Sequence, residues 1–306
     1  MVLPVFYGIF AGAAGGVVYA GYFAGGASST TVDKFAFSDD SRTTLGTGLS
    51  ASTNELAAMA NSGTAGYTGG GNASGLTTTV NKFLFVDDSR TTLGTGLSAA
   101  RTSLAAMANS GTAGYFGGGN SSGTTVDKFA FSDDSRTTLG TGLSSARGDK
   151  LGGMANSGTA GYFGGGYATT TLVDTVDKFA FSDDSRTTLG TGLSSVRVQL
   201  AGMANSGTAG YFGGGYTPII TTVDKFAFSD DSRSTLGTGL SAATRYLAAM
   251  ANSGTAGYFG GGRDAADPVA TVDKFAFPSD SRSTLGTGLS SDRATLAGMA
   301  NAEGLA

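Results

Sequence analysis

The chain has 306 residues, including 52 glycines and only 4 prolines, and it contains no cysteine, histidine or tryptophan. Hydrophobic residues make up 40% and charged residues 14%, which excludes the highly charged, weakly hydrophobic composition of disordered chains. The net charge is −4 and the 19 basic residues are spread evenly, so no basic face for nucleic acid is expected. Disulfides, thiolate chemistry and histidine-based catalysis or metal binding are excluded.

The first 32 residues carry no charged side chain, and residues 2–10 are apolar. No basic residue precedes this stretch, as one would in a secretory signal peptide. Glycines and alanines crowd residues 11–16, which argues against a membrane span. We therefore expect residues 1–16 to form an apolar N-terminal arm or an extra strand, available for self-assembly or for docking on a partner.

Residues 17–306 form a tandem repeat with a period of about 48 residues. The motif Lys-Phe-x-Phe marks each copy. Its first phenylalanine is Phe35, Phe83, Phe129, Phe179, Phe226 and Phe275 in the six copies.

The third copy shows the strands that each repeat is expected to contain. Extended runs cover residues 104–109, 112–116, 125–131 and 136–143, and they are rich in apolar residues and threonine. The pair Ser110-Gly111 is suited to a tight turn between the first two runs, because glycine adopts positive φ. The run Ser132-Asp133-Asp134-Ser135 is suited to a turn between the last two.

Four antiparallel strands per copy, repeated six times, are typical of a β-propeller. A single copy is too small to cover both faces of its sheet, whereas neighbours in a ring would cover them. We therefore predict an all-β fold, a six-bladed β-propeller of four-stranded antiparallel blades. The chain begins with a second strand at residues 17–23 and ends with a first strand at residues 296–301, so we expect these two to pair in one blade. Residues 10–14 resemble a first strand and offer an alternative partner.

Each copy carries the sequence GYFGGG or a close variant, with its tyrosine at Tyr22, Tyr67, Tyr115, Tyr162, Tyr211 and Tyr258. This resembles the kelch repeat, in which an aromatic residue precedes a double glycine. The run TVDKFAF is similar to the third strand of that family, and Arg101, Arg147, Arg197 and Arg293 resemble its arginine after the fourth strand. The chain departs from the family in lacking its tryptophan, in having Thr53 at one arginine position, and in having Arg245 displaced by one. The resemblance implies a kelch-like β-propeller.

The variable segments of the repeat are expected to lie on one face. The first-to-second and third-to-fourth turns are nearly invariant, whereas the second-to-third loops and the passages between blades differ among copies. Loops on a rigid scaffold commonly carry binding residues, although unconstrained drift would give the same pattern. We expect a protein or glycan partner on this face. The candidate binding residues are Tyr167, Tyr216, Arg245, Tyr246, Arg263 and Asp264, which include types enriched at binding hot spots.

Pairs of aspartates occupy the third-to-fourth turns, as in Asp39-Asp40. We expect them to shape these turns and to pair with the arginine that follows, Arg42 in the first copy. A ring of calcium sites is the alternative, since calcium prefers oxygen ligands. The lysine before each first phenylalanine, such as Lys128, is expected to form a structural ion pair.

No arrangement of residues in this sequence indicates catalysis, a metal site or a cofactor. We expect a non-catalytic binding or structural module, a surface adhesin or a component of a virion or extracellular assembly, located outside the cell or on a virion. A multivalent lectin is the alternative, because repeated weak sites gain avidity. A propeller hydrolase is less favoured, because the arginines repeat with the copies while active sites are asymmetric.

Overall fold

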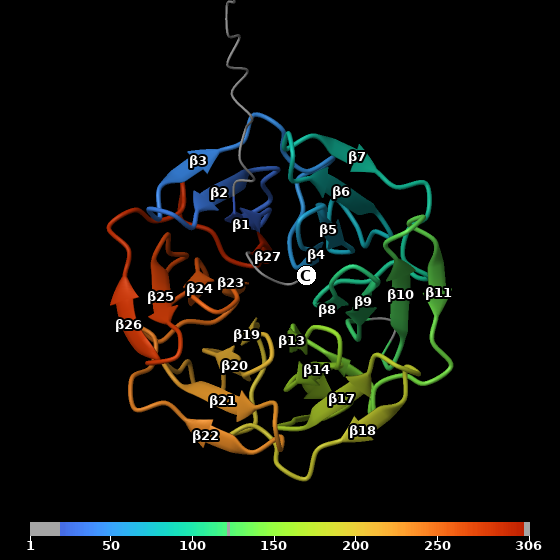
Figure 1. Cartoon of the computed structure of the whole chain (residues 1–306), viewed down its shortest axis with the longest axis vertical. Helices are drawn as coiled ribbons and strands as arrows, with labels where there is room; N and C mark the ends of the chain where they lie inside the picture. The colour runs from blue at the N-terminus through green and yellow to red at the C-terminus, as the bar shows by residue number, and fades with distance from the viewer. Residues whose placement is uncertain (1–18, 121–122, 303–306) are drawn as a thin grey trace, which may run out of the picture.

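The computed structural model describes residues 19–120 and 123–302, in which every regular element is a β-strand. These residues form seven antiparallel sheets, six with four strands and one with three. The six four-stranded sheets are arranged around a common centre, which gives a propeller-like, all-β repeat architecture (Figure 1). Over the same residues, no helix is long and apolar enough to cross a membrane.

The third copy illustrates how one repeat folds. Its strands β8 (Ala105–Asn109), β9 (Ala113–Gly117), β10 (Val126–Ala130) and β11 (Arg136–Thr138) pair in that order from the centre outward (Figure 1). The first three strands start and end close to their predicted bounds. The fourth is shorter than residues 136–143, because the chain leaves the ladder after Thr138 and buries Leu143 in the core.

The other five four-stranded sheets repeat this order. Their strands are β27 (Ala297–Asn301), β1 (Ala20–Ala24), β2 (Val32–Ala36) and β3 (Arg42–Thr44); β4 (Ala57–Asn61), β5 (Ala65–Gly69), β6 (Val80–Leu84) and β7 (Arg90–Thr92); β13 (Gly152–Asn156), β14 (Ala160–Gly164), β17 (Val176–Ala180) and β18 (Arg186–Thr188); β19 (Ala201–Asn205), β20 (Ala209–Gly213), β21 (Val223–Ala227) and β22 (Arg233–Thr235); and β23 (Ala248–Asn252), β24 (Ala256–Gly260), β25 (Val272–Ala276) and β26 (Ser281–Thr284).

The innermost strands contact one another in the cyclic order β27, β4, β8, β13, β19 and β23, and β23 again contacts β27. The sheets meet through side chains and loops rather than through one continuous ladder. One sheet combines strands from both ends of the repeat region, because β27 pairs with β1 over five residues, from Ala20 opposite Asn301 to Ala24 opposite Ala297. The N-terminal arm at residues 1–16, and with it the alternative strand at residues 10–14, lies outside the described residues.

The structure has seven sheets, whereas the sequence predicted six, because a three-stranded sheet accompanies the six four-stranded ones. This additional sheet consists of β12 (Arg147–Gly148), β15 (Tyr167–Ala168) and β16 (Thr171–Leu172). The second-to-third loop of this copy is long enough to fold back on itself, and it then pairs with the preceding passage between sheets. In four other copies the equivalent contact is a single bridge, such as that between Val198 and Tyr216.

The apolar core lies between neighbouring sheets. Within a sheet, Phe116 packs edge-on against Phe129 with ring centroids 5.8 Å apart. Between sheets, Tyr67 stacks on Phe131 at 5.2 Å. Each of these phenylalanines is buried, which contributes roughly 1.5–3 kcal/mol per side chain. The repeat therefore depends on its neighbours for most of its core.

Polar contacts also join each sheet to the next, and we call each one a ring link. The Tyr22 hydroxyl donates to Asp88 Oδ1 at 2.9 Å, and Lys34 Nζ donates to Asp88 Oδ2 at 2.7 Å. Burial, together with the neighbouring carboxylate, raises the pKa of the tyrosine far above its ordinary value. The accepting aspartates are Asp40, Asp88, Asp134, Asp184, Asp231 and Asp280.

These links correct one prediction about the aspartate pairs and bear on another about the lysines. The second aspartate of each pair accepts from a tyrosine and a lysine of the neighbouring sheet, whereas the first, such as Asp39, accepts from the Ser41 backbone N–H at 3.0 Å. Arg42 does not pair with either turn residue, because its Nη1 lies 3.6 Å from Asp33 on the adjacent strand. The lysines do form ion pairs, with an aspartate of the next sheet.

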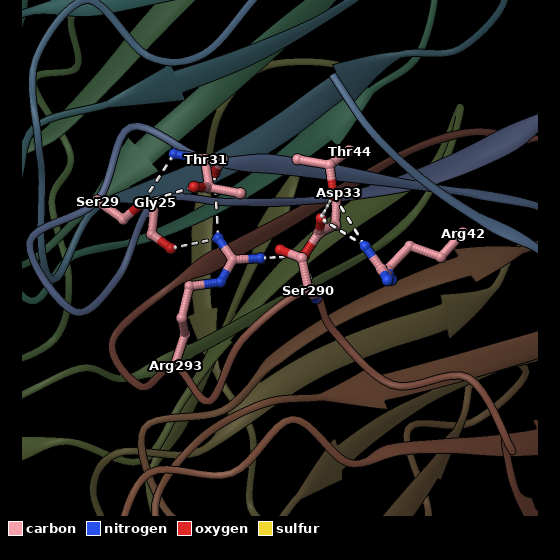
Figure 2. Close-up of polar contacts among 8 residues, drawn as sticks. All are labelled: Gly25, Ser29, Thr31, Asp33, Arg42, Thr44, Ser290 and Arg293. Atoms are coloured by element: carbon pink, nitrogen blue, oxygen red, sulfur yellow. Dashed lines mark hydrogen bonds and ion pairs between the residues drawn. The ribbon is translucent and has the colours of Figure 1, made fainter. Parts of the chain in front are cut away.

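The arginine after the fourth strand is buried in four passages, and Figure 2 shows the example at Arg293. Its Nη2 bonds to Asp33 Oδ2, and its Nη1 donates to the carbonyls of Gly25 and Thr31 at 2.9 and 3.1 Å (Figure 2). Burial would raise the pKa of Asp33, but hydrogen bonds from Ser290 and Thr44 and the charge of Arg293 together hold it below its ordinary value. These pairs fasten four of the six passages to the sheet that follows.

Candidate functional site

The residue immediately before the leucine of each first strand lies at one end of the central axis. The backbone N–H of each such residue donates to the carbonyl of the preceding one at 2.8–3.0 Å, and the sixth closes on the first. We call this closed set of six hydrogen bonds the axial ring. Its members are Glu55, Ser103, Lys150, Gln199, Tyr246 and Thr295.

All six members of the axial ring adopt a left-handed backbone, with φ between 55° and 63°. This conformation costs L-residues other than glycine and asparagine on the order of 1–2 kcal/mol each. Glycine would fit the backbone best, and the repeat uses glycine at other positive-φ positions such as Gly165. Six different side chains are nevertheless present here. Their conformational preference therefore does not account for their presence.

Lys150 reaches across the axis to the opposite side of the ring. Its side chain is almost fully buried, at 6% exposure, and its Nζ donates to the carbonyl of Leu296 at 2.9 Å. The side chain lines a small axial cavity of about 60 Å³ that is otherwise walled by the ends of the first strands. Burial lowers the pKa of Lys150 to about 7, although the charge of Glu55 opposes this shift.

Gln199 and Tyr246 join the ring to the neighbouring passage. Gln199 Nε2 donates to the Tyr246 hydroxyl at 2.8 Å and to Asp149 Oδ1 at 3.1 Å. Gln199 is 5% exposed, and its Oε1 accepts no hydrogen bond. Burial and the nearby carboxylates of Asp149 and Glu55 raise the pKa of Tyr246 to about 12. The site therefore offers an unsatisfied buried acceptor beside an amine, a phenol and two carboxylates.

Four of the six predicted binding residues come together beside this ring. The Arg245 guanidinium lies 4.8 Å from the ring centroid of Tyr216 and 5.8 Å from that of Tyr246. Arg263 pairs with Arg245 through two backbone hydrogen bonds of 2.7 and 3.0 Å. Tyr216 is 43% exposed, so one aromatic face remains open to solvent beside a fixed cation.

The other two predicted residues lie outside the cation–π contacts of this cluster, although Asp264 directly follows Arg263. Asp264 Oδ1 accepts from the backbone N–H groups of Asp267 and Ala266, which lowers the pKa of its carboxyl. Tyr167 is 42% exposed on β15, where it pairs with Gly148 of the neighbouring passage. The predicted set therefore divides into a cluster and two peripheral residues.

Sequence reasoning singled out Tyr246 but missed Lys150, Gln199 and Glu55. These residues were seen only as part of variable passages. When the copies are aligned on the first-strand leucine, both of the positions before it hold a different residue type in every copy, and the sequence does not distinguish the second of them as the position of the axial ring.

The opposite end of the axis carries a cavity of about 1360 Å³, lined mainly by the Asn-Ser-Gly-Thr turns. Its polar groups are already engaged with one another. The backbone N–H of Gly111 donates to Asn61 Oδ1 at 2.7 Å, and that of Ser110 donates to Ser157 Oγ at 3.0 Å. Similar contacts recur around the axis. These contacts join the turns of neighbouring sheets around the axis.

No cluster of three or more acidic side chains suited to a metal ion occurs within residues 19–120 and 123–302. Comparison with models of known protein families gave no match. Comparison with curated proteins also gave none. The fold and the site therefore define the class of protein: a propeller-like, all-β repeat protein with a diversified face.

Proposed function

We propose that this chain is a non-catalytic binding module, a kelch-like β-propeller in which a closed ring of six blades presents the axial ring and its neighbouring loops to a protein partner. The role that best fits is that of a surface adhesin or a component of a virion or extracellular assembly. The scaffold supplies rigidity, since each sheet is fixed to its neighbours by ring links and aromatic stacking.

One observation carries the proposal. The six copies keep the same backbone hydrogen bonds and the same positive φ at the axial ring, yet each copy has a different side chain there. Strained positions of this kind are retained where the surrounding structure enforces them, and they cluster at functional sites. We attribute this diversity to selection for different side-chain chemistry at a position whose backbone is fixed.

The chemistry of Lys150 supports binding over catalysis. A lysine with a pKa of about 7 is partly deprotonated at neutral pH, and only the deprotonated amine acts as a nucleophile. Its Nζ, however, is held by the Leu296 carbonyl and faces a cavity of about 60 Å³, which suffices for water but not for an organic substrate. We therefore assign Lys150 a structural role: it fills this end of the axis and sets the charge of the surface there.

A multivalent or single-site lectin is the second candidate. Tyr216 and Tyr167 are the exposed aromatic residues of this face, at 43% and 42%. An open aromatic face beside polar groups is suited to the apolar face of a sugar ring. Because only two copies carry such a tyrosine, this candidate implies few glycan sites rather than six.

The test uses the purified chain as bait for extracts and surfaces of its native source, followed by quantitative mass spectrometry. The variant Tyr216→Ser/Arg245→Ser/Tyr246→Ser removes the cluster. The control variant Asp39→Asn/Asp133→Asn changes exposed turn residues of the opposite face. We expect a partner that the wild type and the control capture and the cluster variant does not. Equal recovery by all three would refute the proposal, and saturable binding on a glycan array that the cluster variant loses would favour the lectin.

A further inference from the structure

Four copies of the repeat share a buried arginine site, and the chain contains an unfilled version of it. In the filled copies the arginine Nη2 bonds to the aspartate of the following third strand, as Arg197 does to Asp224 at 2.8 Å. The guanidinium also donates to backbone carbonyls. For Arg147 these belong to Phe163, Gly165 and Thr175. Figure 2 shows the same arrangement around Arg293.

In the fifth passage, Thr244 occupies the arginine position, but the aspartate remains as Asp273. Asp273 is only 4% exposed, and its Oδ2 accepts from the backbone N–H and the hydroxyl of Ser241. It therefore has one charged donor fewer than its equivalents. Arg282 does not compensate, because its contact with Oδ1 at 3.6 Å has a counterpart in the filled copies, such as that between Arg186 and Asp177.

The first passage shows what happens when both partners are lost. There Thr53 replaces the arginine and Asn81 replaces the aspartate, and the cavity between them is only about 20 Å³. A buried charge without its partner is strongly destabilising, so loss of both partners is the stable alternative. Asp273 is thus the one aspartate of this set that is kept although its arginine is replaced, and its retention needs an explanation.

A cavity of about 110 Å³ lies where the missing guanidinium would be. Its wall contains Asp273, Phe259, Gly261 and Thr271, which correspond by sequence to the acceptors around Arg147. The displaced Arg245 does not fill it, because that side chain stacks on Tyr216 instead.

The cavity is open and acidic. Its wall includes the exposed residues Ser241, Ala242 and Thr271, so it is connected to solvent on the variable face. Asp264 brings a second carboxylate to the wall, and no lysine or arginine lines it. An incoming cation would therefore meet two carboxylates and a set of carbonyl acceptors.

We propose that this cavity binds a guanidinium group from outside the chain, with its N–H groups donating to Asp273 and to the carbonyls of Phe259, Gly261 and Thr271. The planar group would occupy the place that the chain's own arginine takes in the four filled copies. A partner's arginine side chain and a small guanidinium compound share this chemistry. The inference does not depend on the axial ring, and it would survive failure of the proposed function.

The experiment is isothermal titration calorimetry of the full chain with methylguanidinium chloride, with methylammonium chloride at the same concentration as the ionic control. We expect one equivalent of methylguanidinium to bind saturably, with at least a tenfold preference over methylammonium. The reason is that the planar guanidinium group can donate to several of these acceptors at once, whereas the ammonium group is a compact point charge. Asp273→Asn should weaken binding by about 30-fold or more. Thr244→Arg should abolish it, since the chain then fills its own site.

The variant Thr244→Arg also distinguishes binding in this cavity from binding elsewhere on the chain. A rise in its melting temperature together with loss of binding identifies the cavity as the site. Saturable binding that is equal in the wild type and in Thr244→Arg would overturn the proposal, as would an absence of binding by the wild type. If either variant fails to fold, a crystal of the wild type soaked with methylguanidinium decides the matter: density on Asp273 supports the proposal, and water alone in the cavity refutes it.

A final titration with the peptide acetyl-Gly-Arg-Gly-amide distinguishes the two sources. Tighter binding of the peptide than of methylguanidinium supports the proposed site and assigns its occupant to a protein partner. Tighter binding of methylguanidinium supports the site and assigns its occupant to a small molecule. Binding of neither compound overturns the proposal.

Discussion

Replacing Lys150 with methionine should change how the stability of the protein depends on pH. The pKa of Lys150 is lowered from 10.5 to about 7 by burial. Between these two values the unfolded chain binds one more proton than the folded chain, so the free energy of unfolding rises with pH. Below about pH 7 both states are protonated and this contribution becomes constant.

The size of the effect follows from the same shift. One proton corresponds to about 1.4 kcal/mol per pH unit, so the free energy of unfolding should rise by about 3 kcal/mol from pH 7.5 to 9.5. The chain has no histidine or cysteine to titrate in this window. Above about pH 10, tyrosines ionise in the unfolded chain, while the buried ones of the ring links resist ionisation, so stability should fall again.

The assay is urea unfolding followed by far-ultraviolet circular dichroism, because the chain has no tryptophan for fluorescence. We expect the wild type to show the slope and Lys150→Met to show none. Lys128→Met is the matched control: it removes a lysine that is ion-paired to Asp184 at 2.7 Å, so it should lower stability yet keep the slope. Parallel pH curves for the wild type and Lys150→Met would refute the axial placement of this amine.

Three further predictions concern the scaffold. Arg197→Thr leaves Asp224 buried without its partner and should cost about 3–5 kcal/mol, part of which methylguanidinium should restore; urea unfolding without any loss would contradict the role of the pair. Asp40→Asn keeps a residue that tolerates positive φ but removes the charge facing Lys274, so it should lower the free energy of unfolding by about 1–3 kcal/mol. The control Asp39→Asn should change the free energy of unfolding by less than about 0.5 kcal/mol. Equal melting temperatures for the two variants would argue against the ring link. Deletion of residues 297–306 removes β27 and the buried Met299, whose burial alone contributes roughly 1.5–3 kcal/mol, and it exposes the edge of β1. We therefore expect a lower melting temperature, and self-association in size-exclusion chromatography. An unchanged melting temperature would contradict the importance of this pairing.

Much of the fold could be predicted because the repeat displays its own constraints. Six copies of Lys-Phe-x-Phe set the period, and glycine and aspartate mark the turns. The strand bounds in the third copy follow from these marks. The short fourth strand was placed less well, because the chain leaves the ladder after Thr138 and buries Leu143, and this burial depends on tertiary packing.

The partners of charged residues were harder to predict than the strands. Asp40 and Arg42 are neighbours in sequence, which favoured a local pair. In the structure Asp40 accepts from Tyr258 and Lys274, more than 200 residues away in the chain. Such contacts depend on how adjacent sheets are rotated against each other, which the sequence of a single copy does not encode. The extra sheet at Tyr167 depends likewise on how a loop returns to a passage.

The candidate site was partly accessible to sequence reasoning. Variation among loops drew attention to Tyr216, Arg245 and Tyr246, which lie together in the structure. The burial of Lys150 and Gln199 could not be predicted, because polar residues in a variable passage are ordinarily exposed to solvent. Their importance depends on a backbone conformation that no local residue preference predicts.

The hydrogen bonds of the axial ring use main-chain atoms alone. The side chain at each of the six positions can therefore be exchanged without breaking the circle that holds it, provided that the left-handed conformation is tolerated. The repeated parts of the chain preserve the fold, while the side chains of the axial ring differ from copy to copy. Exchanging those six residues in combination, with the remainder unchanged, would change the charge and polarity of this end of the axis without changing the frame that carries it.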